Sequence, residues 1–198
     1  FWGLGMPLDK MSTPHQGLIE MFPRDWNIYN RDDLLFNMMS LYHQGHRANF
    51  KGLSASYPEA NADHLAWDMT QYIFLAVMGA SVGYLLPHEA SNLILHASQC
   101  LQKQYSSWQD YAKAFQSERF LWQRLTLQPL DYELEQRNKS QDATLKQLLN
   151  HRESPWRKID WKTPLDQAKE NDFFTTITKR YFSHSEEQFE NRDQSILN

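Results

Sequence analysis

A long apolar segment at residues 63–82 constrains the fold of this chain more than any other part of its sequence. Its apolar side chains occupy almost the whole circumference of a helix, a pattern that is typical of a helix buried at the centre of a fold. The longest apolar run, YIFLAVMGASVGYLL at 72–86, is shorter than the roughly 20 residues that a membrane-spanning helix needs. We therefore expect a central helix that ends at Gly83, in a protein without a membrane span.

Further segments carry the periodicity and the end signals of helices. Asn30 is a suitable N-cap for a helix at 31–44, and Gly45 follows its last periodic residue, where a left-handed backbone favours glycine. Pro87 suits the first position of the next helix, and Ser107, with an aspartate three residues later, resembles the start of a capping box. The expected helices are 31–44, 63–82, 87–105, 106–125 and 140–151, with a short one near 15–22 and a charged one at 165–182.

These segments predict an all-α fold, a compact and mainly helical bundle around the central helix at 63–82. No segment alternates convincingly as a strand, although FFTTIT at 173–178 could form a short one. With 198 residues, the chain fits one domain. Within it we expect an irregular N-terminal segment at 1–23, a helical core at 24–161 and a charged C-terminal extension at 162–198.

The charge balance and the cysteine content bear on the class of protein. Lys and Arg number 20 against 24 Asp and Glu, and no basic stripe with interleaved aromatic residues occurs, so we expect no nucleic-acid partner. Cys100 is the only cysteine, which rules out an internal disulfide and a cysteine-rich zinc site and favours a reducing compartment such as the cytoplasm. Because the sequence starts at Phe1 and not at a methionine, we expect a trimmed chain.

Scattered histidines raise the question of a metal site. His43 and His46 form an H-x-x-H pair, but zinc needs a third ligand, and Gly45 breaks the helix between the two rings. His96 and Cys100 are one helical turn apart, with no second pair of ligands to complete a site. We therefore expect no metal and no other cofactor. No spacing selects a third ligand for the first pair among Asp68, His64 and Glu89.

Asp68 lies next to Trp67 inside the otherwise apolar segment, where an isolated charge would be costly. Such a carboxyl group is either paired or protonated. One interpretation is a buried ion pair with Arg47 or Arg119, which would join the first helical region to the central helix. The alternative is a general acid or base that acts with His46, while Arg47 or Arg119 binds an anion, as hydrolysis of a phosphoester or an amide would require.

Other conspicuous residues have simpler interpretations than catalysis. Arg119 and Trp122 share a helix face with Trp108 and Phe115, and we expect the guanidinium to stack on a tryptophan at the edge of the core. The loop at 153–161 contains two tryptophans that should anchor it. No G-x-S-x-G, P-loop or glycine-rich dinucleotide motif occurs, so the sequence offers no recognisable nucleophile or phosphate-binding turn.

Five short motifs, taken together and in order, resemble a bacterial family known as domain of unknown function 1266. They are DWNIYNRDDLL, GHRANF, HLAWDMTQYIFLAVMGASVGYLLPHEA, YSSWQDYAKAFQSERFLW and SPWRKIDW, and they cover roughly residues 24–161. The resemblance implies no reaction, because the family has no established activity. Glu118 stands where the family pattern tends to have glycine. Ser91 stands where an aromatic residue often follows the EEA element of the family. The positions that match motif letters are Trp26, Gly45, His46, Arg47, Phe50, Trp67, Asp68, Gly83, Ser107, Trp108, Arg119, Trp122, Pro155 and Trp156.

These observations favour a non-catalytic protein-interaction or adaptor module in the bacterial cytoplasm, with another protein as its partner. The alternative is a hydrolase whose site is built from His46, Arg47, Asp68 and Arg119. A concave, solvent-open pocket lined by His46, Arg47 and Asp68 would favour the hydrolase. If packing seals these three residues, the adaptor is favoured.

Overall fold

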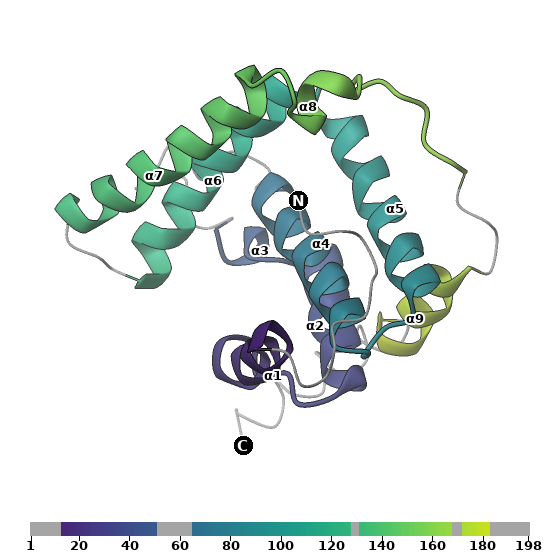
Figure 1. Ribbon diagram of the computed structural model, residues 1–198. Helices are drawn as coiled ribbons and strands as arrows, with labels where there is room; N and C mark the ends of the chain where they lie inside the picture. The colour runs from purple at the N-terminus through teal and green to yellow at the C-terminus, as the bar shows by residue number, and fades with distance from the viewer. Residues whose placement is uncertain (1–12, 51–64, 128–130, 168–171, 183–198) are drawn as a thin grey trace. The chain divides into compact units, whose positions relative to one another are not determined.

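The computed structural model describes residues 13–50, 65–127, 131–167 and 172–182. These residues form α-helices and no strand (Figure 1), so the expected all-α fold is confirmed. None of the described helices is both long and apolar enough to cross a membrane. In chain order they are α1 (Thr13–Trp26), α2 (Arg31–His43), α3 (Arg47–Phe50), α4 (Leu65–Ser81), α5 (Pro87–Gln104), α6 (Trp108–Leu127), α7 (Asp131–Asn150), α8 (Pro155–Lys158) and α9 (Phe173–Phe182).

The described residues divide into two compact units, although the length of the chain fits one domain. The division falls within two helices, after Gln71 of α4 and after Ala97 of α5, so each of these helices contributes to both units. Unit 1 contains residues 13–43, 72–97, 167 and 172–182, and unit 2 contains residues 44–50, 65–71, 98–127 and 131–166.

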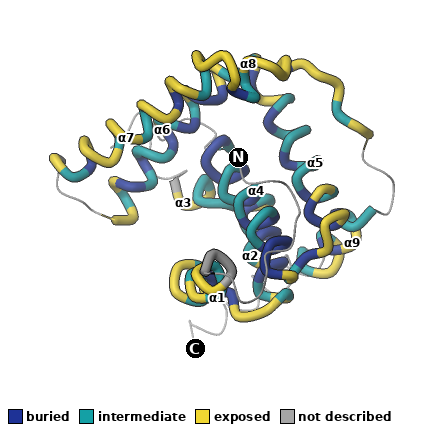
Figure 2. The backbone as a smooth tube through the Cα atoms, in the orientation of Figure 1, coloured by how far each residue is buried: buried dark blue, intermediate teal, exposed yellow. Residues whose placement is uncertain are grey.

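The central apolar helix is present as α4, which runs from Leu65 to Ser81, while residues 63 and 64 lie outside the described part of the chain. Gly83 follows it with a φ of 83°, the left-handed conformation that glycine adopts most readily. Figure 2 shows buried and intermediate residues along α4 and no exposed stretch. The expectation of a largely buried central helix is therefore confirmed.

The N-terminal helices differ in how closely they match the sequence-based expectations. α1 covers Thr13–Trp26 and is longer than the short helix expected near 15–22. α2 matches closely, and the backbone N–H of Asp33 donates to Oδ1 of Asn30 over 3.0 Å, the expected N-cap. The expected irregular segment is thus helical from residue 13, and residues 1–12 lie outside the described chain.

The core of unit 1 contains α2 and the second part of α4. Leu34 of α2 and Leu75 of α4 are fully buried. A Cβ atom at Gly79 of α4 would overlap the end of the Leu34 side chain, so the Leu34 side chain occupies the space beside this glycine.

Arg31 joins the start of α2 to the start of α5 in unit 1. Its guanidinium donates two hydrogen bonds of 2.8 Å to the two carboxylate oxygens of Glu89, and a third of 2.7 Å to the carbonyl of Tyr84. Glu89 also accepts from the backbone N–H of Leu86 over 2.8 Å, and the hydrogen bond from Arg31 keeps the pKa of Glu89 below its ordinary value. Glu89 is therefore an ion-pair and helix-capping residue.

The segment at 173–178 that could have formed a short strand is helical instead, because these residues belong to α9. Phe174 and Ile177 are buried and lie one helical turn apart, so the segment gains an apolar face only when it is helical. The charged helix expected at 165–182 is present only from residue 173 in the described chain, and residues 168–171 lie outside it. β-Branched residues favour strands weakly, and tertiary packing overrides that preference here.

Asp172 attaches the start of α9 to α5 within unit 1. Its Oδ1 accepts the backbone N–H of Thr175 over 2.9 Å, and its Oδ2 accepts from Asn92 Nδ2 over 2.9 Å and lies 2.6 Å from His96 Nε2. The His96 ring stacks on Phe174 with 4.0 Å between ring centres. Burial by itself would raise the pKa of Asp172, but the hydrogen bonds from Asn92, His96 and Thr175 outweigh it and lower that pKa.

α6 and α7 lie side by side in unit 2 (Figure 1). Ser107 caps α6 as expected, because its Oγ accepts the backbone N–H of Asp110 over 3.0 Å. Asp110 reaches back to the backbone N–H of Ser106, one residue earlier than in a standard capping box, over 2.8 Å. The two serines therefore serve as helix-start residues.

α7 starts at Asp131, well before the helix expected at 140–151. Leu134 and Leu145 are its buried apolar anchors, and Figure 2 shows exposed residues along much of its length. An exposed ion pair between Glu135 and Lys139, one turn apart at 2.9 Å, adds only slightly to the helix. The first half of α7 was missed because its sequence lacks a broad apolar stripe, and few of its side chains are buried.

The two tryptophans of the expected loop at 153–161 do anchor it. Trp156 belongs to the one-turn helix α8 and stacks on Trp108 with ring centres 4.8 Å apart. Trp161 is buried, and its Nε1 donates to the carbonyl of Tyr105 over 2.7 Å. Ser154 forms the N-cap of α8. The two tryptophans thus attach this segment to unit 2, Trp156 at the first turn of α6 and Trp161 at the residues that precede α6.

Candidate functional site

The candidate site residues His46, Arg47 and Asp68 meet in unit 2. Asp68 lies in the first turn of α4, and its side chain has no exposed surface. Its Oδ1 accepts the backbone N–H of His46 over 2.9 Å and lies 2.8 Å from the Nδ1 of the same residue. Its Oδ2 accepts the backbone N–H of Arg47 over 3.3 Å and a guanidinium N–H over 2.8 Å. Asp68 is thus the centre of a buried ion pair with Arg47.

Gly45 makes this cluster possible. Its φ is 62°, in the left-handed region expected for the glycine that follows a helix. A Cβ atom at this position would overlap the carboxylate of Asp68, and it would also crowd the Arg47 guanidinium. Glycine is therefore required for both the backbone conformation and the space that the Asp68 carboxylate fills. The GHR motif is a turn that wraps around one buried carboxylate.

A second buried carboxyl group, Glu118 of α6, lies at the start of α4. Its Oε2 accepts the backbone N–H of Trp67 over 2.7 Å, and its Oε1 accepts the hydroxyl of Tyr105 over 3.1 Å. The same hydroxyl accepts the backbone N–H of Ala66 over 3.1 Å. The first N–H groups of a helix have no partner within the helix, so Glu118 and Tyr105 satisfy them from outside.

Burial raises the pKa of Glu118 to about 7, and the nearby Asp68 adds to the increase. The hydrogen bonds from Trp67 and Tyr105 act in the opposite direction but do not restore the ordinary value. In the sequence, Glu118 stands out only as a departure from the pattern of the family that the chain resembles. Its position on the buried face of an otherwise apolar helix is the signal that could have identified it as a buried polar group.

Aromatic rings cover the Asp68 cluster on one side. Trp67 lies 5.0 Å from Trp122 and 5.6 Å from Phe115, measured between ring centres, and His46 meets the edge of Trp122 at 5.9 Å. The Nε1 atoms of both tryptophans are buried and have no hydrogen-bond partner among the described residues. The His46 side chain keeps 27% of its surface exposed, so it is the most accessible member of the cluster.

Arg119 does not join this cluster. In the described part of the chain it forms no ion pair, and it stacks on no aromatic ring, so the expected stacking on a tryptophan is wrong. Its NH1 instead lies 3.5 Å from Oδ1 of Asn138 on α7. Burial lowers the pKa of Arg119 and the nearby Arg137 lowers it further, while the attraction of Asp142 opposes them only in part. The reason is that Arg119 points toward α7, whereas Asp68 meets the turn at Arg47.

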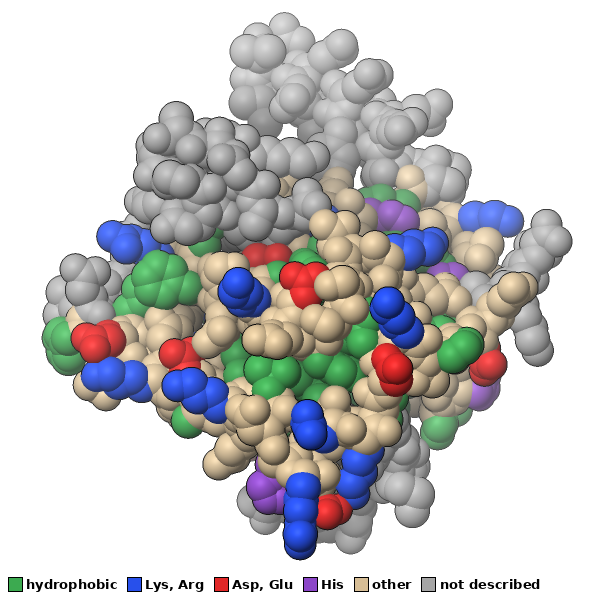
Figure 3. Space-filling model, turned by 90° about the horizontal axis from the view of Figure 1, so that it is seen from above, with side chains coloured by type: hydrophobic (Ala, Val, Ile, Leu, Met, Phe, Trp, Pro, Cys, Tyr) green, Lys and Arg blue, Asp and Glu red, His purple; other side chains and the backbone are tan. Residues whose placement is uncertain are grey.

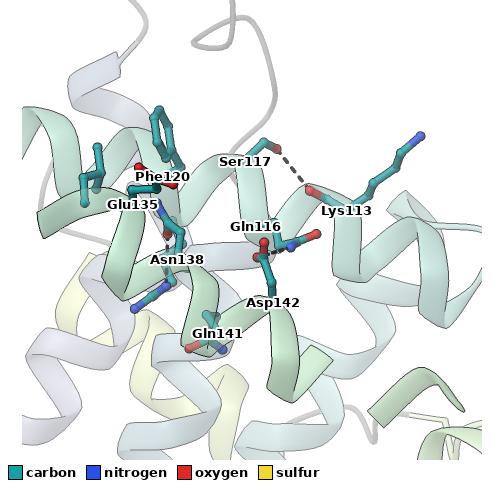
Figure 4. Close-up of a pocket in the computed structure, with 10 residues that line it drawn as sticks. Lys113, Gln116, Ser117, Phe120, Glu135, Asn138, Gln141 and Asp142 are labelled. Atoms are coloured by element: carbon teal, nitrogen blue, oxygen red, sulfur yellow. Dashed lines mark hydrogen bonds between the residues drawn. The ribbon is translucent and has the colours of Figure 1, made fainter. Parts of the chain in front are cut away.

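Arg119 lines a cavity of about 570 Å³ between α6 and α7. Figure 4 shows Gln116 of α6 and Asp142 of α7 meeting at this cavity, where the Gln116 amide donates to Asp142, and it shows Lys113 extending away from the other labelled side chains. His46, Arg47 and Asp68 are not among the lining residues. The cavity lining includes Gln116, Arg119, Phe120, Leu134, Asn138 and Gln141.

The remaining candidate ligands have other partners. No group of three or more His, Cys, Asp or Glu residues that could hold a metal ion occurs in the described parts of the chain. His43 packs on Phe182 with ring centres 4.5 Å apart, and His96 is bonded to Asp172. His64 lies outside the described residues. Cys100, the single cysteine of the sequence, has intermediate exposure.

No curated protein and no solved structure matches this chain. The sequence model of a family described as "Protein of unknown function (DUF1266)" matches residues 56–161, which is more than half of the chain. The matched range contains Asp68, Glu118 and Arg119, while the GHR turn at 45–47 precedes it. The chain therefore belongs to the DUF1266 family.

Proposed function

We propose that this protein is a non-catalytic protein-interaction module of the bacterial cytoplasm, and that its partner is another protein. The observation that carries the proposal is the closure of the Asp68 cluster. Asp68 has no exposed surface, and its two oxygens engage both backbone N–H groups and both side chains of His46 and Arg47. An ionised carboxylate offers about four lone-pair positions, so none remains for a substrate.

The accessible features of unit 2 support binding to a protein. α6 and α7 carry the large cavity, and they also expose Leu127 by 46% and Tyr132 by 64%. Exposed apolar and aromatic side chains are common at protein interfaces. On the face that Figure 3 shows, the basic and acidic side chains of the described residues are interspersed. A mixed surface and a net charge of -4 favour a protein over a nucleic acid.

A site-specific photo-crosslinking amino acid would test this proposal in the native host. One variant carries it at Gln141, on the cavity wall, and a matched control carries it at Lys146, which is exposed on the same helix outside the cavity. We expect one protein to be captured from position 141 and not from position 146. The purified partner should then form a saturable complex with the purified chain, and failure to capture or to reconstitute a complex would contradict the proposal.

A hydrolase remains the second candidate because of one observation. The contact of 2.8 Å between His46 Nδ1 and Asp68 Oδ1 is also the arrangement that orients a histidine as a general base, and the His46 ring is partly exposed. Turnover of phosphoester or amide model substrates by the wild-type chain, abolished in a folded His46→Gln variant, would establish this alternative. We expect the wild-type chain to hydrolyse these substrates no faster than they hydrolyse in buffer without protein.

A further inference from the structure

The Arg119 guanidinium is a half-buried cationic group of the α6–α7 cavity, and the attraction of the nearby Asp142 acts on it without a direct ion pair. Among the described residues it forms no ion pair, and its nearest polar contact is the neutral amide oxygen of Asn138 at 3.5 Å. The two acidic residues of the cavity wall have other donors, because Glu135 pairs with Lys139 at 2.9 Å and Asp142 accepts from Gln116. A half-buried cation without a directly paired anion is costly, so this arrangement favours a ligand that supplies a negative charge.

The rest of the cavity restricts the form of that ligand. Phe120 and Leu134 provide apolar surface, while Asn138 and Gln141 present side-chain amides that can both donate and accept. The carboxylates of Glu135 and Asp142 also lie on the wall and disfavour a group of higher negative charge, such as a phosphate. At about 570 Å³ the cavity falls within the range of about 300–1,000 Å³ that is usual for ligand sites.

From this combination we propose that the α6–α7 cavity binds the free C-terminal carboxylate of a partner protein whose last residue is apolar. The carboxylate pairs with Arg119, the last peptide groups bond to the amides of Asn138 and Gln141, and the terminal side chain rests on Phe120 and Leu134. This inference rests on the proposed function, because it names the part of the partner that the module recognises.

The test uses the full chain and two peptides that differ only at their ends. They are acetyl-Gly-Gly-Leu with a free carboxylate and acetyl-Gly-Gly-Leu-amide. The side-chain amide signals of Gln116, Asn138 and Gln141 provide a direct readout by ¹⁵N nuclear magnetic resonance. We expect saturable shifts of these signals with the free acid, and binding of the amide that is weaker by about tenfold or more, because a charge-assisted hydrogen bond to Arg119 is lost.

Variants of two arginines on the same helix provide the matched control. Arg119→Gln should reduce the affinity for the free acid to that for the amide, whereas Arg124→Gln, at an exposed position outside the cavity lining, should bind like the wild type. The wild-type comparison of acid with amide does not depend on the folding of either variant. Absence of saturable shifts, or equal affinity for the two peptides, would overturn the inference.

A third probe separates a peptide terminus from a small free acid. N-acetyl-leucine carries the same carboxylate and side chain without the preceding peptide groups, and we expect it to bind more weakly than the tripeptide. Equal affinity for N-acetyl-leucine would overturn the assignment to a protein C-terminus, as would displacement of the tripeptide by an equal concentration of inorganic phosphate. If these tests fail while the cross-linked complex still forms, the protein-interaction function stands and only the mode of recognition is wrong.

Discussion

The buried carboxyl group of Glu118 should make the stability of this protein fall as the pH rises from 5 to 8. Burial raises the pKa of Glu118 from 4.5 to about 7 in the folded chain. The folded state therefore holds a proton at this residue over a range in which the unfolded state has already lost it. By linkage, the stability associated with this proton is fully present below a pH of about 4.5 and is lost as the pH rises through about 7.

The size of the effect follows from the two pKa values. A difference of one pKa unit corresponds to about 1.4 kcal/mol. With values of 4.5 unfolded and about 7 folded, Glu118 alone should lower the free energy of unfolding by about 2.5 kcal/mol between a pH of about 5 and a pH of about 8. Glu118→Gln keeps an oxygen acceptor for the backbone N–H of Trp67 and removes the titrating group.

Urea unfolding at a pH of about 5 and of about 8 measures this contribution as a difference between two proteins. We expect the change in unfolding free energy between the two conditions to differ by about 2.5 kcal/mol between the wild type and Glu118→Gln. Glu135→Gln removes an exposed glutamate of α7, and its free energy of unfolding should change between the two pH values as much as that of the wild type. Equal pH dependence of the wild type and Glu118→Gln would refute the assignment of a raised pKa to Glu118.

Three further variants test other parts of the structure by urea unfolding. Gly45→Ala should lose at least about 2 kcal/mol, because the new side chain meets a positive φ and overlaps the carboxylate of Asp68; stability within about 0.5 kcal/mol of the wild type would argue against this turn. Asp172→Asn should lower stability at neutral pH and reduce the loss of stability in acid, because the lowered pKa of Asp172 stabilises the folded chain above its unfolded pKa and this stabilisation is lost as the pH falls; an unchanged acid transition would contradict that contribution. Trp161→Phe should cost about 1–3 kcal/mol, because it leaves the carbonyl of Tyr105 without this donor, and a neutral effect would show that the bond is dispensable.

Local signals in the sequence were sufficient to predict many helix ends. Asn30, Ser107 and Pro87 mark starts that the structure contains, because an N-cap hydrogen bond involves residues only two or three positions apart. Gly45 and Gly83 mark ends, because a left-handed backbone strongly favours glycine whatever packs around it. The apolar circumference of α4 predicted its burial in the same way.

Features that depend on distant contacts could not be predicted. The choice between Arg47 and Arg119 as the partner of Asp68 depends on the direction in which α6 presents its side chains, and no local pattern encodes it. Glu118 meets the start of α4 across the fold, so its role as a cap has no sequence motif. The segment at 173–178 allowed a short strand by its local pattern, but two buried side chains of α9 decide in favour of a helix.

The claim that Asp68 serves the fold and not a reaction is tested most directly by Asp68→Asn. Because breaking a buried ion pair leaves the partner charge unpaired, we expect a loss of about 3–5 kcal/mol in unfolding free energy. Arg47→Gln should be destabilised as well, and the double variant should lose clearly less than the two single losses combined. Asp166→Asn, at an exposed position, should stay within about 0.5 kcal/mol of the wild type. An Asp68→Asn protein as stable as the wild type, or more stable, would contradict the structural role and would favour an active site held under strain.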